Sequence, residues 1–164
     1  MRQINPILAL CVGIALVGSS SLLAQSGPRR NQQELDALKL VNAWDQAWNQ
    51  KDVQKVASYM TDDVEFGLPG MIFKGRAQFL QEWVKQNMSG ITYEIVSEYA
   101  AGDVNQTVVV QKRVDHATIG GNKMDLPFVG YFRVKGGKII EWLDVPIGNL
   151  PPIPGANTSG RSGR

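Results

Sequence analysis

Four β-rich segments in the second half of the chain limit the folds that are open to it. They span residues 91–99, 106–118, 123–134 and 138–145. Gly120-Gly121 and Gly136-Gly137 separate the last three segments, and short glycine loops of this kind join neighbouring antiparallel strands. The pattern predicts an antiparallel meander, in which each strand pairs with the next one along the chain.

Helical patterns dominate the part of the chain that precedes this meander. Apolar residues at helical spacing predict helices over residues 33–49, 53–60 and 79–88. Asn31 and Asp52 are placed to cap the first two helices. We expect a turn at Thr61-Asp62-Asp63 and then a short strand at residues 64–68. Three N-terminal helices followed by a meander predict an α+β fold, with a curved antiparallel sheet packed on the helices.

Both ends of the chain differ in composition from this domain. Arg2, an apolar run at residues 7–17 and small residues up to Ala24 predict a signal peptide over residues 1–24. An uncleaved membrane anchor is the alternative. After cleavage we expect a periplasmic or secreted protein that is free of the membrane. Residues 25–32 form a predicted linker, 33–146 the domain, and 147–164 a tail rich in proline and glycine that we expect to be disordered.

The overall composition excludes several classes of function. Lys and Arg number 17 against 15 Asp and Glu, so the net charge is +2 and nucleic-acid binding is not expected. The chain has one Cys and one His, too few for a thiolate or histidine metal site. It has no glycine-rich phosphate-binding motif, and we expect no cofactor. The remaining candidates for chemistry are carboxylates and arginine.

The first glycine hairpin determines which polar residues of the meander share a face. If Gly120-Gly121 is a two-residue loop, Arg113 lies opposite Phe128 and Asp115 lies opposite Leu126. Strand alternation then places Gln111, Arg113 and Asp115 on one face of the sheet.

The second glycine hairpin determines the face of Asp144. A two-residue loop would pair Asp144 with Val129, on the face opposite Arg113. A three-residue loop, residues 135–137, would pair Asp144 with Phe128 and bring it to the face of Arg113. In that register the two residues lie two strands apart, roughly 10 Å. A long arginine side chain then holds Asp115 on its own strand and Asp144 across the sheet.

Two carboxylates and one guanidinium in an apolar surrounding would have a defined protonation state. Their charges sum to −1, which is costly to bury, and one shared proton removes the excess charge. We therefore expect one aspartate pKa to be raised and the other to be held down. Such a pair supplies an acid and a base together, as epoxide opening by water requires.

These residues resemble the limonene-1,2-epoxide hydrolase family, within the SnoaL-like, nuclear-transport-factor-2-like superfamily. The resemblance rests on Arg113-Val114-Asp115, Leu126–Phe132, Gly137-Lys138-Ile139 and Trp142-Leu143-Asp144, and it covers about Glu34 to Val145. It implies a cone-shaped α+β fold, often a homodimer, and hydrolysis in one step without a cofactor. It further implies that Asp144 is the base that activates water, Asp115 the acid, and Arg113 the bridge between them.

The chain departs from this family at the residues that hold the reacting water. Phe66 and Leu68 stand where the family has a Tyr and an Asn, and neither side chain can hydrogen-bond to water. Asp45, next to the Trp44/Trp48 stripe of the first helix, and Gln111 are candidates to position the water instead.

Six apolar side chains are predicted to form the substrate pocket. They are Trp48, Phe66, Leu68, Leu126, Phe128 and Trp142. The expected activity is hydrolysis of a small apolar epoxide, with water as the second substrate, to a diol. Two alternatives are a ketosteroid-isomerase-like or SnoaL-like isomerase or cyclase, and a periplasmic protein that binds an apolar ligand without catalysis.

Overall fold

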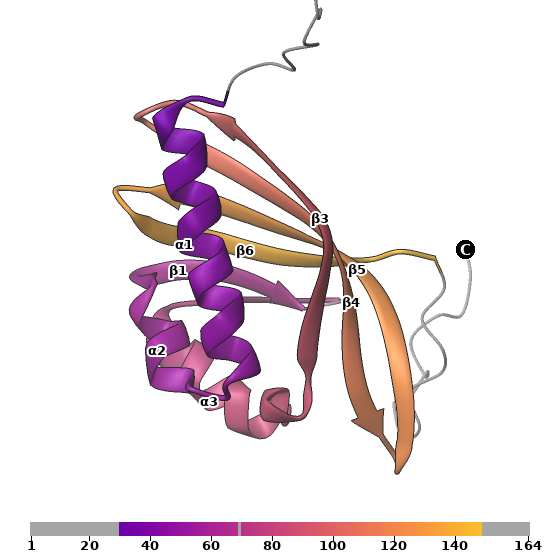
Figure 1. Ribbon diagram of the computed structural model, residues 1–164. Helices are drawn as coiled ribbons and strands as arrows, with labels where there is room; N and C mark the ends of the chain where they lie inside the picture. Colours follow the sequence, from indigo (N-terminus) through magenta and orange to yellow (C-terminus); the bar gives the residue numbers. More distant parts are fainter. Residues whose placement is uncertain (1–29, 69, 149–164) are drawn as a thin grey trace, which may run out of the picture.

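Three helices lie against one side of a curved sheet, as predicted, and the sheet has six strands (Figure 1). This computed structural model describes residues 30–68 and 70–148. The helices are α1 (Gln32–Asn49), α2 (Val53–Ser58) and α3 (Arg76–Lys85), with a short 3₁₀ turn, η1 (Met88–Gly90). The strands are β1 (Met60–Leu68), β2 (Met71–Lys74), β3 (Thr92–Gly102), β4 (Thr107–Ile119), β5 (Asn122–Lys135) and β6 (Lys138–Pro146). The predicted signal peptide and residues 149–164 of the predicted tail lie outside the described residues.

Local sequence signals determine where the first two helices begin. Asn31 and Glu34 form a capping box at α1, in which each side chain binds the backbone N–H of the other residue at 2.9 Å. Asp52 Oδ1 accepts a hydrogen bond from the Lys55 backbone N–H at 3.0 Å and caps α2. Among the residues that the structure describes, no helix is both long enough and apolar enough to cross a membrane.

The strand order is β2-β1-β6-β5-β4-β3. Strands β3 to β6 form the predicted antiparallel meander, and β1 pairs in parallel with β6. The prediction of a turn at residues 61–63 is wrong, because β1 already begins at Met60 and pairs there with Ile139. The short edge strand β2 is an element that the sequence did not predict.

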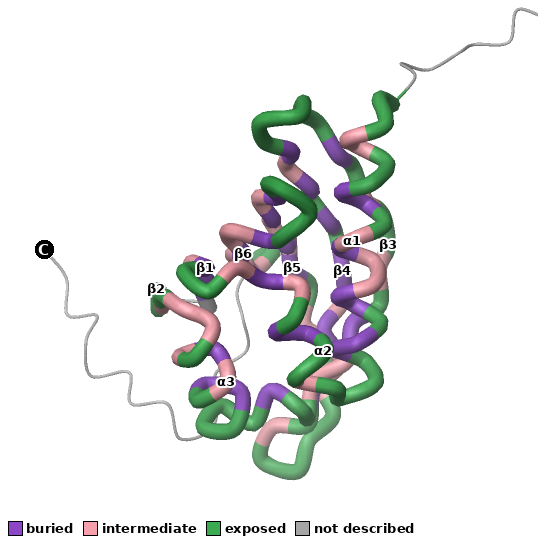
Figure 2. Tube along the Cα trace, turned by 90° about the vertical axis from the view of Figure 1, so that its left-hand side faces the viewer, coloured by how far each residue is buried: buried purple, intermediate pink, exposed green. Residues whose placement is uncertain are grey.

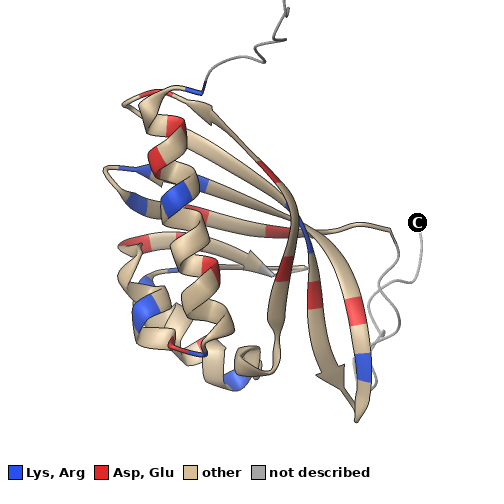
Figure 3. Cartoon of the chain, in the orientation of Figure 1, with Lys and Arg blue, Asp and Glu red and all other residues tan. Residues whose placement is uncertain are grey.

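Aromatic side chains of α1, α3 and the sheet form the core. Trp44 and Trp142 are completely buried, and their ring centroids lie 5.1 Å apart. Trp48 is packed edge-on against Trp83 at 4.4 Å. Figure 2 shows buried segments along α1 and the strands beside it. Acidic and basic positions are interspersed along α1 and over the sheet, in keeping with the near balance of charges (Figure 3).

The two glycine hairpins set the register that positions the candidate site. Both are two-residue loops with positive φ at each glycine. The β4–β5 register is confirmed, with Arg113 opposite Phe128 and Asp115 opposite Leu126.

The predicted register between β5 and β6 is wrong, although Asp144 lies on the predicted face. Lys135 pairs with Lys138 across a two-residue loop, so the expected three-residue loop is not formed. A bulge then shifts the register within β6, and Asp144 pairs with Gly130 rather than with Phe128. The extra residue in the bulge moves each later side chain of β6 to the opposite face of the sheet, just as a longer loop would. Asp144 therefore lies on the face of Arg113.

Candidate active site

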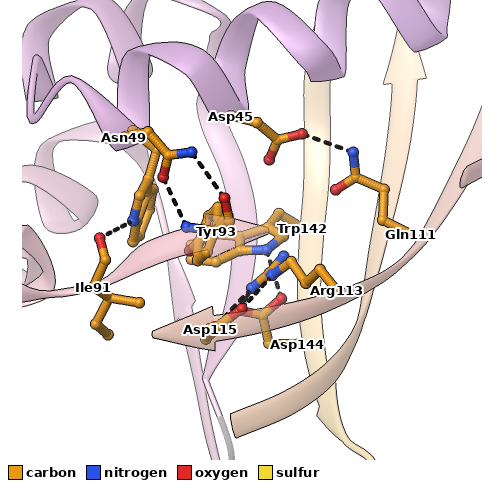
Figure 4. A network of polar contacts seen from close by, with 10 residues as sticks. Asp45, Asn49, Ile91, Tyr93, Gln111, Arg113, Asp115, Trp142 and Asp144 are labelled. Atoms are coloured by element: carbon orange, nitrogen blue, oxygen red, sulfur yellow. Dashed lines mark hydrogen bonds and ion pairs between the residues drawn. The ribbon is translucent and has the colours of Figure 1, made fainter. Parts of the chain in front are cut away.

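Arg113 lies at the centre of a buried charged cluster (Figure 4). Its Nε and Nη2 atoms donate to the two carboxylate oxygens of Asp115 at 2.7 and 3.3 Å. Nη2 also donates to Oδ2 of Asp144 at 2.6 Å. The side chains of Arg113, Asp115 and Asp144 are 0%, 7% and 5% exposed. The bridge across the sheet, predicted from strand alternation, is confirmed.

Gly130 allows the guanidinium to cross the strand that separates the two carboxylates. It lies on β5 and pairs with Gln111 on one side and Asp144 on the other. A Cβ atom at this position would lie 2.6 Å from Nη1 of Arg113. The arginine therefore rests directly on the glycine, and a side chain here would displace it.

Trp142 fixes the carboxylate of Asp144 from within β6. Its Nε1–H donates to Oδ1 of Asp144 at 2.9 Å, while Arg113 binds the other oxygen. The two residues are two positions apart and share a face of the strand. The indole ring is held by the core, so Asp144 has a defined orientation.

Both aspartates line a cavity of about 450 Å³. Four of the six predicted pocket residues line it with them: Trp48, Leu126, Phe128 and Trp142. Phe66 lies instead in the core, stacked on Phe73 at 5.0 Å, and is not among the lining residues. Leu68 ends β1, and its side chain lies outside the described part of the structure. The cavity wall is mainly apolar, and the aspartates are its charged groups.

Tyr93 is a cavity residue that the sequence analysis missed. It lies on β3 directly opposite Asp115 and lines the cavity with it. The guanidinium of Arg113 lies 3.9 Å from the centre of its ring, and Trp48 stacks on it at 4.7 Å. Burial raises the pKa of the Tyr93 phenol well above its usual value, so the hydroxyl remains a hydrogen-bond donor.

Burial raises the pKa of both bridged aspartates. The pKa of Asp144 rises to about 6, and that of Asp115 also rises, although the charge of Arg113 opposes both shifts. The expectation that one pKa would be held down is therefore wrong, because desolvation outweighs the attraction of a cation that two carboxylates share. The aspartates titrate as a coupled pair, and the form with one proton balances the charge of Arg113.

Asp45 and Gln111 contact each other behind this cluster. Gln111 Nε2 donates to Oδ2 of Asp45 at 2.7 Å, and both residues are buried. Neither residue lines the cavity, so neither side chain has direct access to the reacting water that it was predicted to position. Burial raises the pKa of Asp45 to about 7.

The outer face of the same sheet carries a separate charged group. His116 Nδ1 lies 2.8 Å from Asp125, and its Nε2 lies 3.1 Å from Glu94. The three side chains are between 40% and 77% exposed. His116 therefore points away from the cavity. Within residues 30–68 and 70–148, no cluster of His, Cys, Asp or Glu is arranged to hold a metal ion.

The fold and the site define a class of small α+β domains in which helices and a curved sheet enclose an apolar cavity. The SnoaL-like domain family matches residues 41–142, more than half of the chain. The chain therefore belongs to the SnoaL-like family. No curated protein matches it significantly.

Three solved structures illustrate the similarity of fold. A proposed ketosteroid isomerase from Kribbella flavida DSM 17836 has a TM-score of 0.58 and 19% identity, covering 76% of this chain and 87% of its own. A proposed polyketide cyclase from Xanthomonas campestris pv. campestris has a TM-score of 0.55 and 19% identity, covering 68% of this chain and 90% of its own. A proposed polyketide cyclase from Pseudomonas putida KT2440 has a TM-score of 0.54 and 20% identity, covering 70% of this chain and 92% of its own. At these identities the likeness shows the fold alone.

Proposed function

We propose that the protein is a cofactor-independent hydrolase that adds water to a small apolar epoxide and releases a diol. One observation carries this proposal: Arg113 holds Asp115 and Asp144 together at the wall of an apolar cavity. The pair supplies a proton donor and a proton acceptor within reach of one bound molecule. The resemblance to limonene-1,2-epoxide hydrolases supports the same chemistry.

The resemblance assigns the roles within the singly protonated pair: the proton lies on Asp115, and Asp144 is ionised. Ionised Asp144 takes a proton from water as the water oxygen bonds to an epoxide carbon. The carbon–oxygen bond of the ring breaks, and protonated Asp115 donates its proton to the departing oxygen. Arg113 keeps both carboxyls in place and offsets the negative charge. After this step Asp144 is protonated and Asp115 is ionised. Exchange of protons with solvent then restores the starting form.

The side chains around the pair suit an apolar substrate. Trp48, Leu126, Phe128 and Trp142 line the cavity, and a volume of about 450 Å³ holds a small organic molecule. Phe66 cannot hold the water, so we assign this task to Tyr93, which lines the same cavity as both carboxyls.

The fold neighbours support a second candidate in the same superfamily. Their names describe ketosteroid isomerases and polyketide cyclases. A carboxyl with a pKa of about 6 in an apolar cavity also suits removal of a proton next to a carbonyl group. In this reaction Asp144 would remove the proton, and Asp115 would protonate the carbonyl oxygen.

An epoxide panel in ¹⁸O-labelled water tests the proposal. We expect wild type to form a diol that contains one ¹⁸O atom, and Asp144→Asn and Asp115→Asn to lose at least about a hundredfold in rate. Asp125→Asn is the matched control, because its exposed carboxyl lies on the outer face. Exchange of protons next to a ketone without diol formation would favour the isomerase or cyclase. Retention of an apolar ligand without any product would favour a binding protein.

We also propose that the protein is exported and forms a homodimer. The N-terminal segment supports export, and the resemblance supports the dimer. Intact mass of the protein recovered from the periplasm or the medium tests cleavage after Ala24. Light scattering at several concentrations tests the dimer.

A further inference from the structure

Asn49, the last residue of α1, binds the backbone of a cavity residue with both polar atoms of its side-chain amide (Figure 4). Its Oδ1 accepts a hydrogen bond from the Tyr93 N–H at 2.7 Å, and its Nδ2 donates to the Tyr93 carbonyl oxygen at 2.9 Å. Neighbouring antiparallel strands exchange the same pair of bonds within a sheet. A side chain of the helix thus takes the place of a strand beside Tyr93.

Tyr93 needs such a partner because it lies on the edge strand of the sheet. β3 is the last strand in the sheet order and has β4 as its neighbour, where Asp115 lies opposite Tyr93. Backbone N–H and C=O groups on the outer side of an edge strand have no ladder partner. Asn49 supplies one, and because it is 44 positions from Tyr93 in the sequence, the two bonds also join the helix to the sheet.

Other side chains at the end of α1 bind the backbone just before β3. Trp48 Nε1 donates to the Ile91 carbonyl oxygen at 3.2 Å, and Lys51 Nζ donates to the same oxygen. Ile91 lines the cavity, as does Trp48. The ring of Trp48 in turn stacks on Tyr93 at 4.7 Å. The end of α1 therefore holds this part of the cavity wall through backbone and ring contacts.

The place of Tyr93 matters because its ring covers the group that joins the two aspartates. The guanidinium of Arg113 lies 3.9 Å from the ring centre, and an aromatic face attracts a cation at this distance. The same guanidinium donates to Asp115 and Asp144. Tyr93 also lines the cavity together with both aspartates. Movement of the Tyr93 backbone would therefore change the support of Arg113 and the wall of the cavity together.

We propose that Asn49 is a positioning residue of the site: its amide holds Tyr93 against the guanidinium of Arg113 and at the cavity wall. It acts from outside the cavity, since Asn49 is exposed and is not among the described residues that line it. The expected effect on turnover rests on the proposed function, in which Tyr93 holds the reacting water. The contact between Tyr93 and Arg113 does not depend on any substrate.

NMR spectroscopy of the substrate-free protein tests this positioning directly. Asn49→Leu keeps the approximate size of the side chain and removes both hydrogen bonds. We expect the Tyr93 backbone N–H to exchange with solvent about tenfold faster. The Arg113 Nε–H signal should also shift, because the ring current of Tyr93 acts on it from a different position. Unchanged exchange of the amides between β4 and β5 would show that the sheet is intact. Asn49→Ser also removes the amide and replaces Asn49→Leu if that variant does not fold.

Asn42→Leu is the matched control, because Asn42 also joins α1 to β3. Its Nδ2 donates to Oε1 of Glu98 at 3.0 Å, away from Tyr93 in the β3 sequence. This variant should leave the Tyr93 exchange rate and the Arg113 signal unchanged. If folded Asn49→Leu protein also leaves both unchanged, Asn49 does not position Tyr93 and the inference is overturned.

With an active epoxide substrate, the kinetic effect should appear in kcat. We expect Asn49→Leu to lower kcat about tenfold and to change KM by less than about twofold, because the apolar side chains that bind the epoxide remain. In a Tyr93→Phe background the same change should lower kcat by less than about threefold, since the hydroxyl that it positions is already absent. An equal loss in both backgrounds would make Asn49 merely structural and overturn the inference. Wild type without epoxide activity would refute the proposed function, while the NMR signals would still decide whether Asn49 positions Tyr93.

Discussion

Replacing Gly130 by alanine tests whether the position of Arg113 depends on the bare backbone beneath it. An added Cβ would lie 2.6 Å from Nη1 of Arg113, whereas ordinary contacts begin near 3.4 Å. The guanidinium must therefore move by about 0.8 Å, the difference between these distances. The 2.6 Å bond from Nη2 to Asp144 is then stretched toward the limit of a hydrogen bond.

The expected loss of stability combines three contributions. Overpacking costs about 1–3 kcal/mol, and weakening a charged hydrogen bond costs up to about 1.5–3 kcal/mol. Alanine gains about 0.5–1 kcal/mol over glycine inside a strand. The net expectation for Gly130→Ala is a loss of about 2–5 kcal/mol.

Urea denaturation and epoxide turnover measure the two consequences. We expect a lower midpoint with an unchanged slope, and a fall of about a hundredfold in turnover, because the carboxyls lose their common support. Val129→Ile adds a methyl group to the neighbouring position of the same strand and should change stability by less than about 1.5 kcal/mol. A Gly130→Ala protein as stable and as active as wild type would refute the argument that Arg113 needs this glycine.

Three further predictions concern the surroundings of the carboxyls. Tyr93→Phe keeps the ring stacked on Arg113 but removes the hydroxyl, so epoxide turnover should fall by about ten- to hundredfold with little loss of stability; full turnover would exclude Tyr93 as the group that holds water. Trp142→Phe removes the N–H that favours ionised Asp144, so NMR titration should show the pKa of Asp144 rising further, and an unchanged value would contradict this. Since the folded-state pKa of Asp45 lies above its ordinary value of 3.8, its contribution is fully present below pH 3.8 and is lost as pH rises through about 7. Denaturation from pH 4 to 8 should therefore show wild type losing stability relative to Asp45→Asn, and parallel curves would contradict it.

The sequence predicted those parts of the fold that depend on local signals. Asn31 and Asp52 cap their helices through contacts three residues away, and a two-glycine loop sets the β4–β5 register by itself. The beginning of β1 depends instead on Ile139, nearly eighty residues further on, with which Met60 pairs. The turn-forming residues at 61–63 do not interrupt the strand, but they coincide with an irregularity between Met60 and Glu65 in the β1–β6 pairing.

The candidate site was predicted from the alternation of side chains between the two faces of each strand, and not from the exact register. Arg113 and Asp115 share a face because side chains alternate, whichever loops surround them. Asp144 reaches that face because its strand gains one residue relative to β5, and a bulge achieves this as well as a longer loop. Tyr93 was missed because no glycine hairpin sets the register of residues 91–99 in the sequence. An irregularity between Ile95 and Ser97 shifts the β3–β4 register, and Tyr93 comes to lie opposite Asp115.

Gly130 was a readable signal that the sequence analysis did not use. The confirmed β4–β5 register already places it opposite Gln111, two positions from Arg113 and in the interior of a strand. A glycine weakens a strand there unless another group must pass close to the backbone. Arg113 lies beside that glycine on one neighbouring strand, and Asp144 lies on the other. The guanidinium of Arg113 is therefore the group expected to pass over the glycine. The three residues together therefore predict the direction of the Arg113 side chain, which alternation alone does not specify.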